Sequence, residues 1–299
     1  MKSSALIRSW LACVCLTLVC LQAGDARARD LQDVRAAGVL RHLGVPYANF
    51  VSGSGDGLDV ELIQGFAARL GVRYEYVATD WTHAFGDLTG RHARSAESRA
   101  ELLDETPVKG DVLANGVTIL SWREQVVDFS DPTFPSGVWL IAPADAGLSP
   151  IPPSGNLSRD IGQVKGLLRG RSVLALENTC LDARLYAVKE TGAEVRMLPH
   201  VRNLNEMAPA MLRGDAETSL LDVPDVLVAL DKWPGEIKVI GPVSNAQFMG
   251  VAFRKESPQL REAFNRYLGE IRADGTYEAL VKKHFPAMPD YFPEFFARR

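Results

Sequence analysis

Short β-rich runs alternate with helical hydrophobic patterns along this chain, and this alternation constrains its fold more than any other feature. An apolar stripe at helical spacing within residues 59–70, for example, is followed by a β-rich run at 72–78. A second set of such elements starts near Ile161 and continues to the C-terminal third of the chain. Because alternating strands and helices build sheets covered by helices, the pattern predicts an α/β fold.

Two sets of elements predict two lobes. The 299 residues are long for one compact core and suit two domains of about 100–150 residues each. The sets are joined at 135–143, and the chain returns at 247–254, which predicts a hinge with two crossovers. Lobe 1 is then expected to comprise residues 29–136 plus 249–299, and lobe 2 residues 137–248. A hinge of this kind forms a cleft that closes around a ligand.

Some local expectations within this scheme depend on single segments. Residues 89–109 are polar and of mixed charge, and we expect a surface excursion with one helical turn, not a functional run of charge. A helix is expected to start at Cys180 and another at Pro224. Ser257 and Pro258 are typical of an N-cap followed by proline at the first helical position.

The first 28 residues are typical of a secretory signal peptide. Lys2 and Arg8 precede an apolar run at 10–21, and Ala28 ends a small-residue pattern that predicts cleavage before Arg29. The apolar run is shorter than the roughly 20 residues that a membrane-spanning helix needs. We therefore expect export to the periplasm.

The cysteines are distributed unevenly along the chain. Cys13, Cys15 and Cys20 lie in the predicted signal peptide, so only Cys180 remains in the mature protein. The mature fold is then expected to lack an internal disulfide and to depend on its core alone.

Charge and histidine placement exclude several functions. The net charge of −4 argues against nucleic-acid binding, which needs a basic face to neutralise phosphates. The five histidines do not approach the spacing of metal ligands. The sequence therefore predicts neither a nucleic-acid partner nor a bound metal or cofactor.

A specific motif occupies the middle of the chain. Residues 116–123 read G-V-T-I-L-S-W-R, and residues 127–132 read V-D-F-S-D-P. This resembles the signature of the periplasmic solute-binding proteins of polar amino-acid uptake, family 3, which usually reads G-x-T-x-T-x-E-R…x-F-S-x-P. Further pieces resemble the family in the same order, at 38–41, 57–62, 168–173, 221–224 and 250–255. The resemblance spans almost the whole mature chain and implies the type II periplasmic-binding fold.

The resemblance implies two charged ligand contacts. Arg123 aligns with the arginine that grips the α-carboxylate of the ligand, and a guanidinium offers two parallel donors that suit a carboxylate. Asp222 matches the acid that takes the α-ammonium group in many members. Asp222 and Asp225 also have the spacing of a helix capping box, and both roles are compatible.

Small polar residues complete the expected site. Thr118 is expected to present its hydroxyl and backbone, and Asn115 and Gly116 lie on the same turn, where glycine permits close backbone approach. Thr179 and Cys180 occupy the turn whose amides complete the carboxylate site in the family.

That second turn departs from the family pattern. Asn178 replaces the usual glycine, and Cys180 replaces a hydroxyl residue. Capping of a helix by Thr179, paired with Asp182, is the alternative for this turn. A nucleophilic role for Cys180 would need an activating partner, and no histidine stands near it in a recognisable motif.

Tyr47, Phe50 and Trp81 align with aromatic positions that enclose the ligand side chain in the family. Flat apolar walls bury ligand surface at little cost in entropy, although each residue equally suits the protein core. Asp80 and Glu177 are candidates to meet a polar or cationic ligand tail, although each equally suits a solvated surface.

The resemblance therefore implies a monomeric binding protein, not an enzyme, which captures an amino-acid-like zwitterion and delivers it to an inner-membrane ABC permease. The alternative is an enzyme similar to the periplasmic cyclohexadienyl dehydratases, which use a carboxylate three residues after the aspartate that matches Asp222. Asp225 occupies that position. A ligand-binding module of a receptor, sensor or lytic enzyme is a third alternative.

Overall fold

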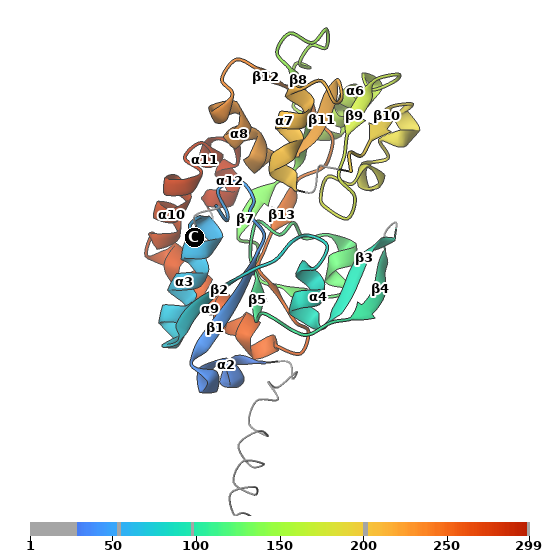
Figure 1. Cartoon of the computed structure of the whole chain (residues 1–299). Coiled ribbons are helices and arrows are strands. Elements are labelled where there is room, and N and C mark those ends of the chain that lie inside the picture. The colour runs from blue at the N-terminus through green and yellow to red at the C-terminus, as the bar shows by residue number, and fades with distance from the viewer. Residues whose placement is uncertain (1–28, 53–54, 97–98, 200–202, 298–299) are drawn as a thin grey trace, which may run out of the picture.

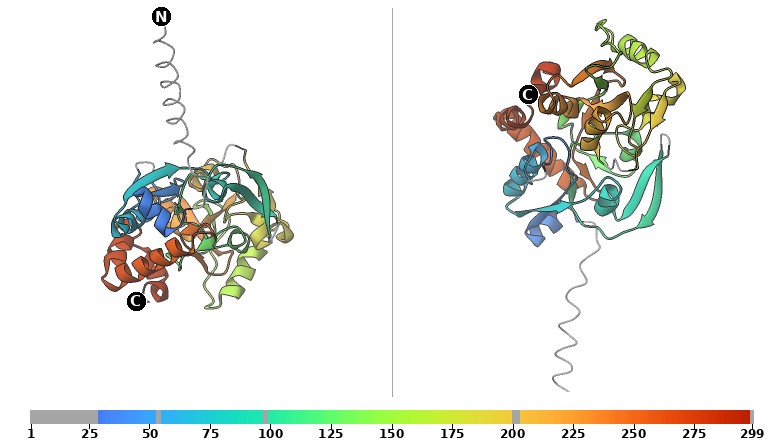
Figure 2. Two further views of the ribbon diagram at one scale, coloured as in Figure 1. Left: turned by 90° about the horizontal axis from the view of Figure 1, so that it is seen from below. Right: turned by 45° about the horizontal axis from the view of Figure 1, so that its top comes forward.

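The computed structural model describes residues 29–52, 55–96, 99–199 and 203–297. It contains two lobes that lie one above the other, with strands running between them (Figure 1). Figure 2 shows the same arrangement from two other directions. The predicted signal peptide, its cleavage site and its three cysteines lie outside the described residues.

Lobe 1 is built around a five-stranded sheet of order β2-β1-β5-β14-β6. β1 is parallel to both β2 and β5, whereas β14 is antiparallel to β5 and β6. The strands are β1 (Val39–Gly44), β2 (Arg73–Ala78), β5 (Val112–Leu113), β6 (Asp128–Phe129) and β14 (Ala252–Phe253). The helices of this lobe are α2 (Leu31–Ala37), α3 (Leu58–Leu70), α4 (Ala84–Thr89), α5 (Ser121–Glu124), α9 (Pro258–Ala273), α10 (Thr276–His284), α11 (Met288–Tyr291) and α12 (Pro293–Phe296).

Lobe 2 has its own five-stranded sheet, of order β10-β9-β11-β8-β12. The strands are β8 (Val138–Pro143), β9 (Ser172–Leu174), β10 (Glu194–Arg196), β11 (Thr218–Asp222) and β12 (Ile237–Pro242). The helices are α6 (Leu157–Gly166), α7 (Met207–Leu212) and α8 (Val223–Lys232), with 3₁₀ turns at Ala183–Tyr186, Lys189–Thr191 and Leu204–Glu206. The predicted alternation of strands and helices is therefore confirmed in both lobes.

Two crossovers connect the lobes. β7 (Phe134–Ser136) and β13 (Gln247–Met249) pair as an antiparallel ribbon, and Thr118 bridges to Met249 beside it. This ribbon gives the hinge that the sequence predicts. The lobe boundaries at residues 136 and 248 fall within it or beside it, and we retain them as a proposal.

The segment 89–109 differs from its expectation. It forms an antiparallel hairpin of β3 (Arg91–Ala96) and β4 (Arg99–Glu105), so the expected helical turn is wrong. The two strands satisfy each other's backbone groups, and Ala93 and Ala100 pack against the smaller of the two apolar cores. Pairing between strands thus overrides the weak local preference of a charge-rich sequence.

The helix expected from Cys180 is also absent, because the chain there forms two short 3₁₀ turns instead. Each turn ends at a residue with left-handed backbone geometry, Ala187 at φ 51° and Gly192 at φ 82°. These residues stop the helix before a second turn can form.

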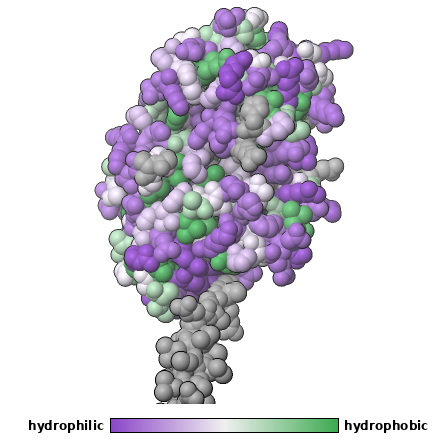
Figure 3. All heavy atoms as spheres, in the orientation of Figure 1, coloured by the Kyte–Doolittle hydropathy of each residue, from purple (hydrophilic) through white to green (hydrophobic). Residues whose placement is uncertain are grey.

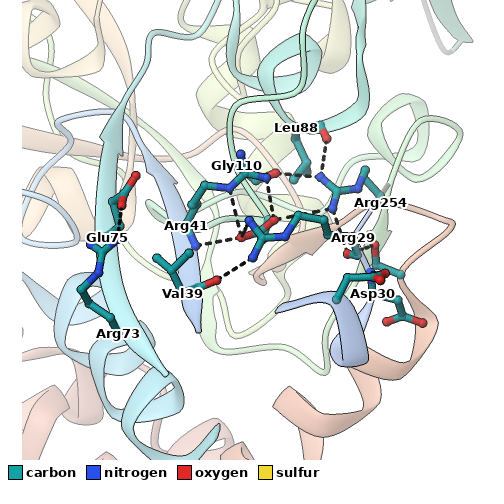
Figure 4. A network of polar contacts seen from close by, with 12 residues as sticks. Arg29, Asp30, Val39, Arg41, Arg73, Glu75, Leu88, Gly110 and Arg254 are labelled. Carbon is teal, nitrogen blue, oxygen red and sulfur yellow. Dashed lines mark hydrogen bonds and ion pairs between the residues drawn. The ribbon is translucent and has the colours of Figure 1, made fainter. Parts of the chain in front are cut away.

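A buried ionic network anchors the base of lobe 1 (Figure 4). Asp111 is fully buried and takes charged contacts from Arg41 at 3.0 Å, Arg29 at 3.4 Å and Arg254 at 3.8 Å. The Arg254 guanidinium also donates to the carbonyls of Leu88, Gly110 and Arg29. The network joins the start of the described chain to β1 and to the segment after β14.

The surface is largely polar. Hydrophilic residues dominate the face in Figure 3, and hydrophobic residues form only small, scattered patches there. Among the described helices, none is long and apolar enough to cross a bilayer.

Candidate ligand-binding site

Residues from both lobes converge where β5 and β11 end. The loop after β5 and the short helix α5 supply Asn115, Thr118 and Arg123 from lobe 1. The end of β11 and the turn after β9 supply Asp222 and Cys180 from lobe 2. All five side chains are buried. Carboxyl ends of strands at an interlobe boundary are a common location for ligand sites.

Arg123 is buried without an anionic partner. Its relative exposure is 0%, and within the described ranges it makes one hydrogen bond, from Nη1 to the Thr118 carbonyl at 2.9 Å. Nε and Nη2 have no acceptor among the described residues. Rings of Trp81, Phe85 and Trp122 lie within 5.1–5.4 Å of the guanidinium carbon. Burial lowers the pKa of Arg123, and this geometry leaves two parallel donors for an anion.

Asp222 lies on the other lobe from Arg123, and one of its two carboxylate oxygens is already hydrogen-bonded within the protein. Oδ2 accepts hydrogen bonds from the Tyr47 hydroxyl at 2.8 Å and the Cys180 thiol at 2.9 Å. Oδ1 is buried and has no partner among the described residues. Burial raises the pKa of Asp222, whereas the two donors and the charge of Arg123 oppose that rise. The carboxylate thus keeps one oxygen for a cationic or donor group.

The two charges do not neutralise each other directly. Each affects the pKa of the other, yet Arg123 and Asp222 form no ion pair within 4 Å. A cation and an anion are therefore held apart in one buried space, which suits the two ends of a zwitterion.

Asn115 and Thr118 add further uncommitted groups from the same loop. Both ends of the buried Asn115 amide lack a partner among the described residues. The Thr118 hydroxyl has no well-formed hydrogen bond, although it is close enough to the Cys180 thiol to affect the pKa of that thiol. Buried polar groups are rarely left unpaired in proteins, so this concentration marks a candidate binding site.

Gly116 shapes this loop through its backbone. It has a φ of 65°, and a Cβ there would lie 2.6 Å from the Phe50 ring, so only glycine fits. Its amide donates to Oδ2 of the buried Asp59 at 2.6 Å, so that amide is already committed within lobe 1. Burial raises the pKa of Asp59 to about 7.

Asp59 is a site-supporting residue that sequence reasoning missed. It lies in the first turn of α3, next to the apolar stripe that this helix buries. An acid at the buried start of a helix, with no basic neighbour in the sequence, is the signal that would have identified it.

The turn after β9 keeps its backbone geometry despite its unusual sequence. Asn178 has a φ of 61°, a conformation that asparagine adopts more readily than most residues. Thr179 donates to the Leu176 carbonyl and accepts from the Leu181 amide. Asp182 accepts from the amides of Asn178 and Arg184 rather than from Thr179. The hydroxyl of Thr179 is thus committed within the turn.

The Cys180 thiol lies at the centre of the site as a hydrogen-bond donor. Burial, reinforced by the charge of Asp222, raises the pKa of this thiol well above its usual value. A protonated thiol is a poor nucleophile. In this geometry the thiol of Cys180 is a hydrogen-bond donor that fixes the position of Oδ2 of Asp222.

The three aromatic candidates occupy different positions. Tyr47 contacts Asp222 directly, and Trp81 covers the Arg123 guanidinium. Phe50 stacks on Tyr47 and packs against Phe134 and Phe285 in the core of lobe 1. Phe50 thus lies behind Tyr47, one layer away from the charged groups.

The capping box expected at the start of α8 is not formed. Asp222 occupies the N-cap position, but its side chain makes no capping hydrogen bond because Oδ2 is engaged by Tyr47 and Cys180. Asp225 is buried in the first turn of α8. Burial and the nearby charge of Asp222 raise the pKa of Asp225 well above its usual value.

Hydrogen bonds between the lobes surround the site. Besides the Tyr47–Asp222 bond, the Ala48 amide donates to Asn205 at 2.9 Å, and the Ser95 amide of β3 donates to Asn178 at 3.2 Å.

Two cavities adjoin the candidate site. One of about 610 Å³ is lined by Trp81 and Thr179 among others, and one of about 970 Å³ is lined by Trp122 and Tyr186 among others.

Comparison with known proteins agrees with this geometry. Residues 95–287 match the bacterial extracellular solute-binding proteins, family 3. The chain is 27% identical over 250 residues to the lysine/arginine/ornithine-binding periplasmic protein of Escherichia coli, which covers 80% of this chain and 84% of that protein. It is 25% identical to the membrane-bound lytic murein transglycosylase F of Desulfosudis oleivorans, covering 79% of this chain but only 45% of that protein.

Solved structures give the same picture. Holo ArgBP from T. maritima matches with a TM-score of 0.63 at 25% identity, over 85% of this chain and 99% of that chain. The fold is therefore of the type II periplasmic-binding class, as the sequence predicts, and the relatives support a solute-binding role. The chain belongs to the bacterial extracellular solute-binding proteins, family 3.

Proposed function

We propose that this protein is exported through its signal peptide and binds an α-amino-acid-like zwitterion in the periplasm, between its two lobes. Arg123 binds the carboxylate of the ligand and Oδ1 of Asp222 binds its ammonium group. The ligand-bound protein then delivers its solute to an inner-membrane ABC permease. The observation that carries this proposal is the buried guanidinium of Arg123, whose Nε and Nη2 have no acceptor among the described residues.

The energetic argument follows from burial. An unpaired charge in a protein interior costs several kcal/mol, and a matching counter-charge with good hydrogen bonds offsets that cost. A ligand carboxylate would satisfy both free donors of Arg123, while its ammonium group would satisfy Oδ1 of Asp222. Binding is therefore coupled to closure of the two lobes, because the partners come from opposite sides of the hinge.

The site favours binding over catalysis. The thiol of Cys180 is held protonated by its surroundings and donates to Asp222, so no activated nucleophile stands near the charged groups. The solute-binding relatives named for amino acids, including lysine, arginine and ornithine, support the ligand class.

One observation favours a second candidate, a dehydratase of the cyclohexadienyl type. A general acid needs a pKa near or above the working pH. Burial and the charge of Asp222 raise the pKa of Asp225 well above its usual value, the direction that a general acid needs, and no capping box accounts for its presence. Conversion of prephenate or arogenate by the mature protein, lost in Asp225→Asn, would establish this activity.

A thermal-shift panel on the mature protein tests the binding function. The panel contains the proteinogenic amino acids, small peptides, dicarboxylates, prephenate and arogenate. A ligand at 100 times its dissociation constant stabilises the folded state by about 2.7 kcal/mol, which gives an easily measured shift. We expect stabilisation by an amino acid in wild type and none in Arg123→Met. A shift that persists in Arg123→Met, or no shift with any amino acid, would refute the proposal.

A further inference from the structure

The cavity of about 610 Å³ beside the charged site is enclosed by both lobes. We call it the hairpin chamber. Lobe 1 contributes the segment before α4 and the β3–β4 hairpin, and lobe 2 contributes the turn after β9. Its lining residues are Asp80, Trp81, Thr82, His83, Ala93, Arg94, Leu103, Leu176, Glu177, Asn178 and Thr179.

Two residues that line the hairpin chamber also contact or adjoin the charged site. Trp81 lines the chamber, and its ring also covers the Arg123 guanidinium at 5.1 Å. Thr179 lines it from the other lobe and precedes Cys180, whose thiol donates to Asp222. A ligand held by Arg123 and Asp222 therefore has this chamber next to both of its charged ends.

The hairpin makes the chamber an interlobe enclosure. Ala93, Arg94 and Leu103 form its hairpin wall, and the Ser95 amide donates to the Asn178 side chain across the lobes. The buried Nε1 of Trp81 has no acceptor among the described residues. The walls are thus apolar along part of their length and polar at a few points, which is typical of a side-chain pocket.

The charged groups of the chamber favour a cation. Asp80 is paired with His83 at 2.8 Å, and Arg94 is paired with Glu101 at 2.7 Å. Glu177 also faces Arg94, and Arg184 lies near them but is held by Asp182 at 2.6 Å. Glu177 forms no hydrogen bond and no ion pair within 4 Å with any described residue. Its side chain is exposed, and among the described residues it is the lining carboxylate without a close partner.

We propose that the hairpin chamber receives the side chain of the ligand and selects a cationic one, with Glu177 as a specificity-determining residue. This inference rests on the proposed function, because it assumes that Arg123 and Asp222 hold the backbone groups of an amino acid. The ligand class that fits is an α-amino acid with an aliphatic stem ending in a guanidinium or ammonium group. The stem packs along Trp81 and Leu103, and the cation approaches Glu177.

The second cavity is the natural competitor for the side chain. It is larger, at about 970 Å³, and Glu177 reaches its edge too. However, most of its lining comes from lobe 2 alone, and Trp122 and Tyr186 are among its lining residues. Glu190 lines this second cavity but not the hairpin chamber, so it provides a matched control.

Calorimetric titration with L-arginine and L-citrulline tests the inference, because citrulline replaces the guanidinium with a neutral group of the same shape. We expect wild type to bind L-arginine at least tenfold more tightly than L-citrulline. Glu177→Gln reduces this ratio below threefold and changes the affinity for L-citrulline by less than threefold. Glu190→Gln keeps the wild-type ratio.

A second variant tests the location without changing charge. Ala93→Phe fills the hairpin chamber from β3, so it lowers the affinity for L-arginine at least tenfold and leaves that for L-alanine within threefold. Circular dichroism checks that each variant is folded.

Several results would overturn the inference while leaving the proposed function intact. These are equal affinities for L-arginine and L-citrulline in wild type, an unchanged ratio in Glu177→Gln, or loss of L-alanine binding in Ala93→Phe. If the protein bound only acidic or apolar amino acids, and this binding depended on Arg123, the chamber inference would also fail while the proposed function would stand. Failure of every amino acid to bind would overturn the proposed function itself.

Discussion

Two buried arginines in this protein have opposite surroundings. Arg254, at the base of lobe 1, donates to the carbonyls of Leu88, Gly110 and Arg29, which Figure 4 labels, and it lies 3.8 Å from Asp111. Arg123, in the cleft, donates to one carbonyl and has no carboxylate within 4 Å in the part of the chain that the structure describes. Their exposures are 1% and 0%, so burial does not distinguish them.

The difference separates a paired buried charge, which stabilises the fold, from an unpaired one, which we propose binds the ligand. The Asp111 network keeps its charges paired and joins distant segments of lobe 1, which is what a structural ion network does. The cleft holds a cation, an anion and an amide with uncommitted atoms in one small space. Such groups destabilise the empty protein, and they persist where a ligand satisfies them.

The largest effect on stability is expected from Arg254→Met. The substitution leaves the carbonyls of Leu88 and Gly110 without their donor and removes one cation from Asp111. We expect a loss of about 3–5 kcal/mol in the free energy of unfolding. Urea unfolding of the mature protein measures it. A loss below about 1 kcal/mol would mean that the network does not stabilise lobe 1.

Arg123→Met is the matched substitution in the cleft. It removes an unpaired cation and places an apolar side chain among Trp81, Phe85 and Trp122. We expect the ligand-free variant to be as stable as wild type or more stable, by up to about 2 kcal/mol, since apolar replacement of buried charge is often stabilising. The same urea experiment checks this, and a loss comparable to that of Arg254→Met would erase the contrast.

Asp59, a buried carboxyl group that supports the loop of the candidate site, is expected to make the stability of the protein depend on pH. Its folded-state pKa is about 7 against 3.8 for an ordinary aspartate, so the folded protein keeps a proton that the unfolded chain releases. Stability due to this group therefore falls as pH rises from about 4 to 7, by about 2 kcal/mol between pH 5 and pH 7.

The measurement for Asp59 is a difference between two proteins. His42 is also buried, with a pKa lowered to about 4, and its contribution has the opposite slope over part of this range. Urea unfolding of wild type and Asp59→Asn at pH 5, 6 and 7 cancels that contribution. Parallel stability curves for the two proteins would exclude titration of Asp59 in the folded state.

The smallest effect is expected from Asn178→Gly, at the contact between β3 of lobe 1 and the turn after β9 of lobe 2. Asn178→Gly keeps the left-handed backbone at φ 61° but removes the acceptor for the Ser95 amide. Relief of backbone strain and loss of one hydrogen bond nearly cancel, so we expect a stability change within about 1 kcal/mol. Thermal unfolding measures it, and a larger loss would show that this contact holds the lobes together.

The sequence predicted the topology and also predicted that Arg123 and Asp222 lie in the same site. Alternating elements and two connecting segments were sufficient for two lobes and a hinge. Because strands of both lobes end at the hinge, Arg123 after β5 and Asp222 at the end of β11 meet in the structure. These two residues are 99 positions apart in the chain, and the family resemblance, not the local sequence pattern, predicted that they would share a site.

The errors have a common physical origin in contacts between distant segments. The hairpin at 91–105 forms because two charge-rich strands pair, which residue preferences do not reveal. Asp222 does not cap α8 because Tyr47 and Cys180 occupy its Oδ2 oxygen. The partner of the Gly116 amide is Asp59, which lies 57 positions away. Each result depends on tertiary packing that a single sequence leaves open.

One calorimetric experiment tests the central claim most directly. The amino acid that stabilises wild type and its carboxamide, which lacks the carboxylate charge, are each titrated into wild type and Arg123→Met. If Arg123 binds the carboxylate, wild type prefers the acid at least 100-fold, and the variant discriminates less than about threefold, in line with losses measured for buried charge pairs. Equal discrimination by the two proteins would contradict the account, because the carboxylate would then bind elsewhere.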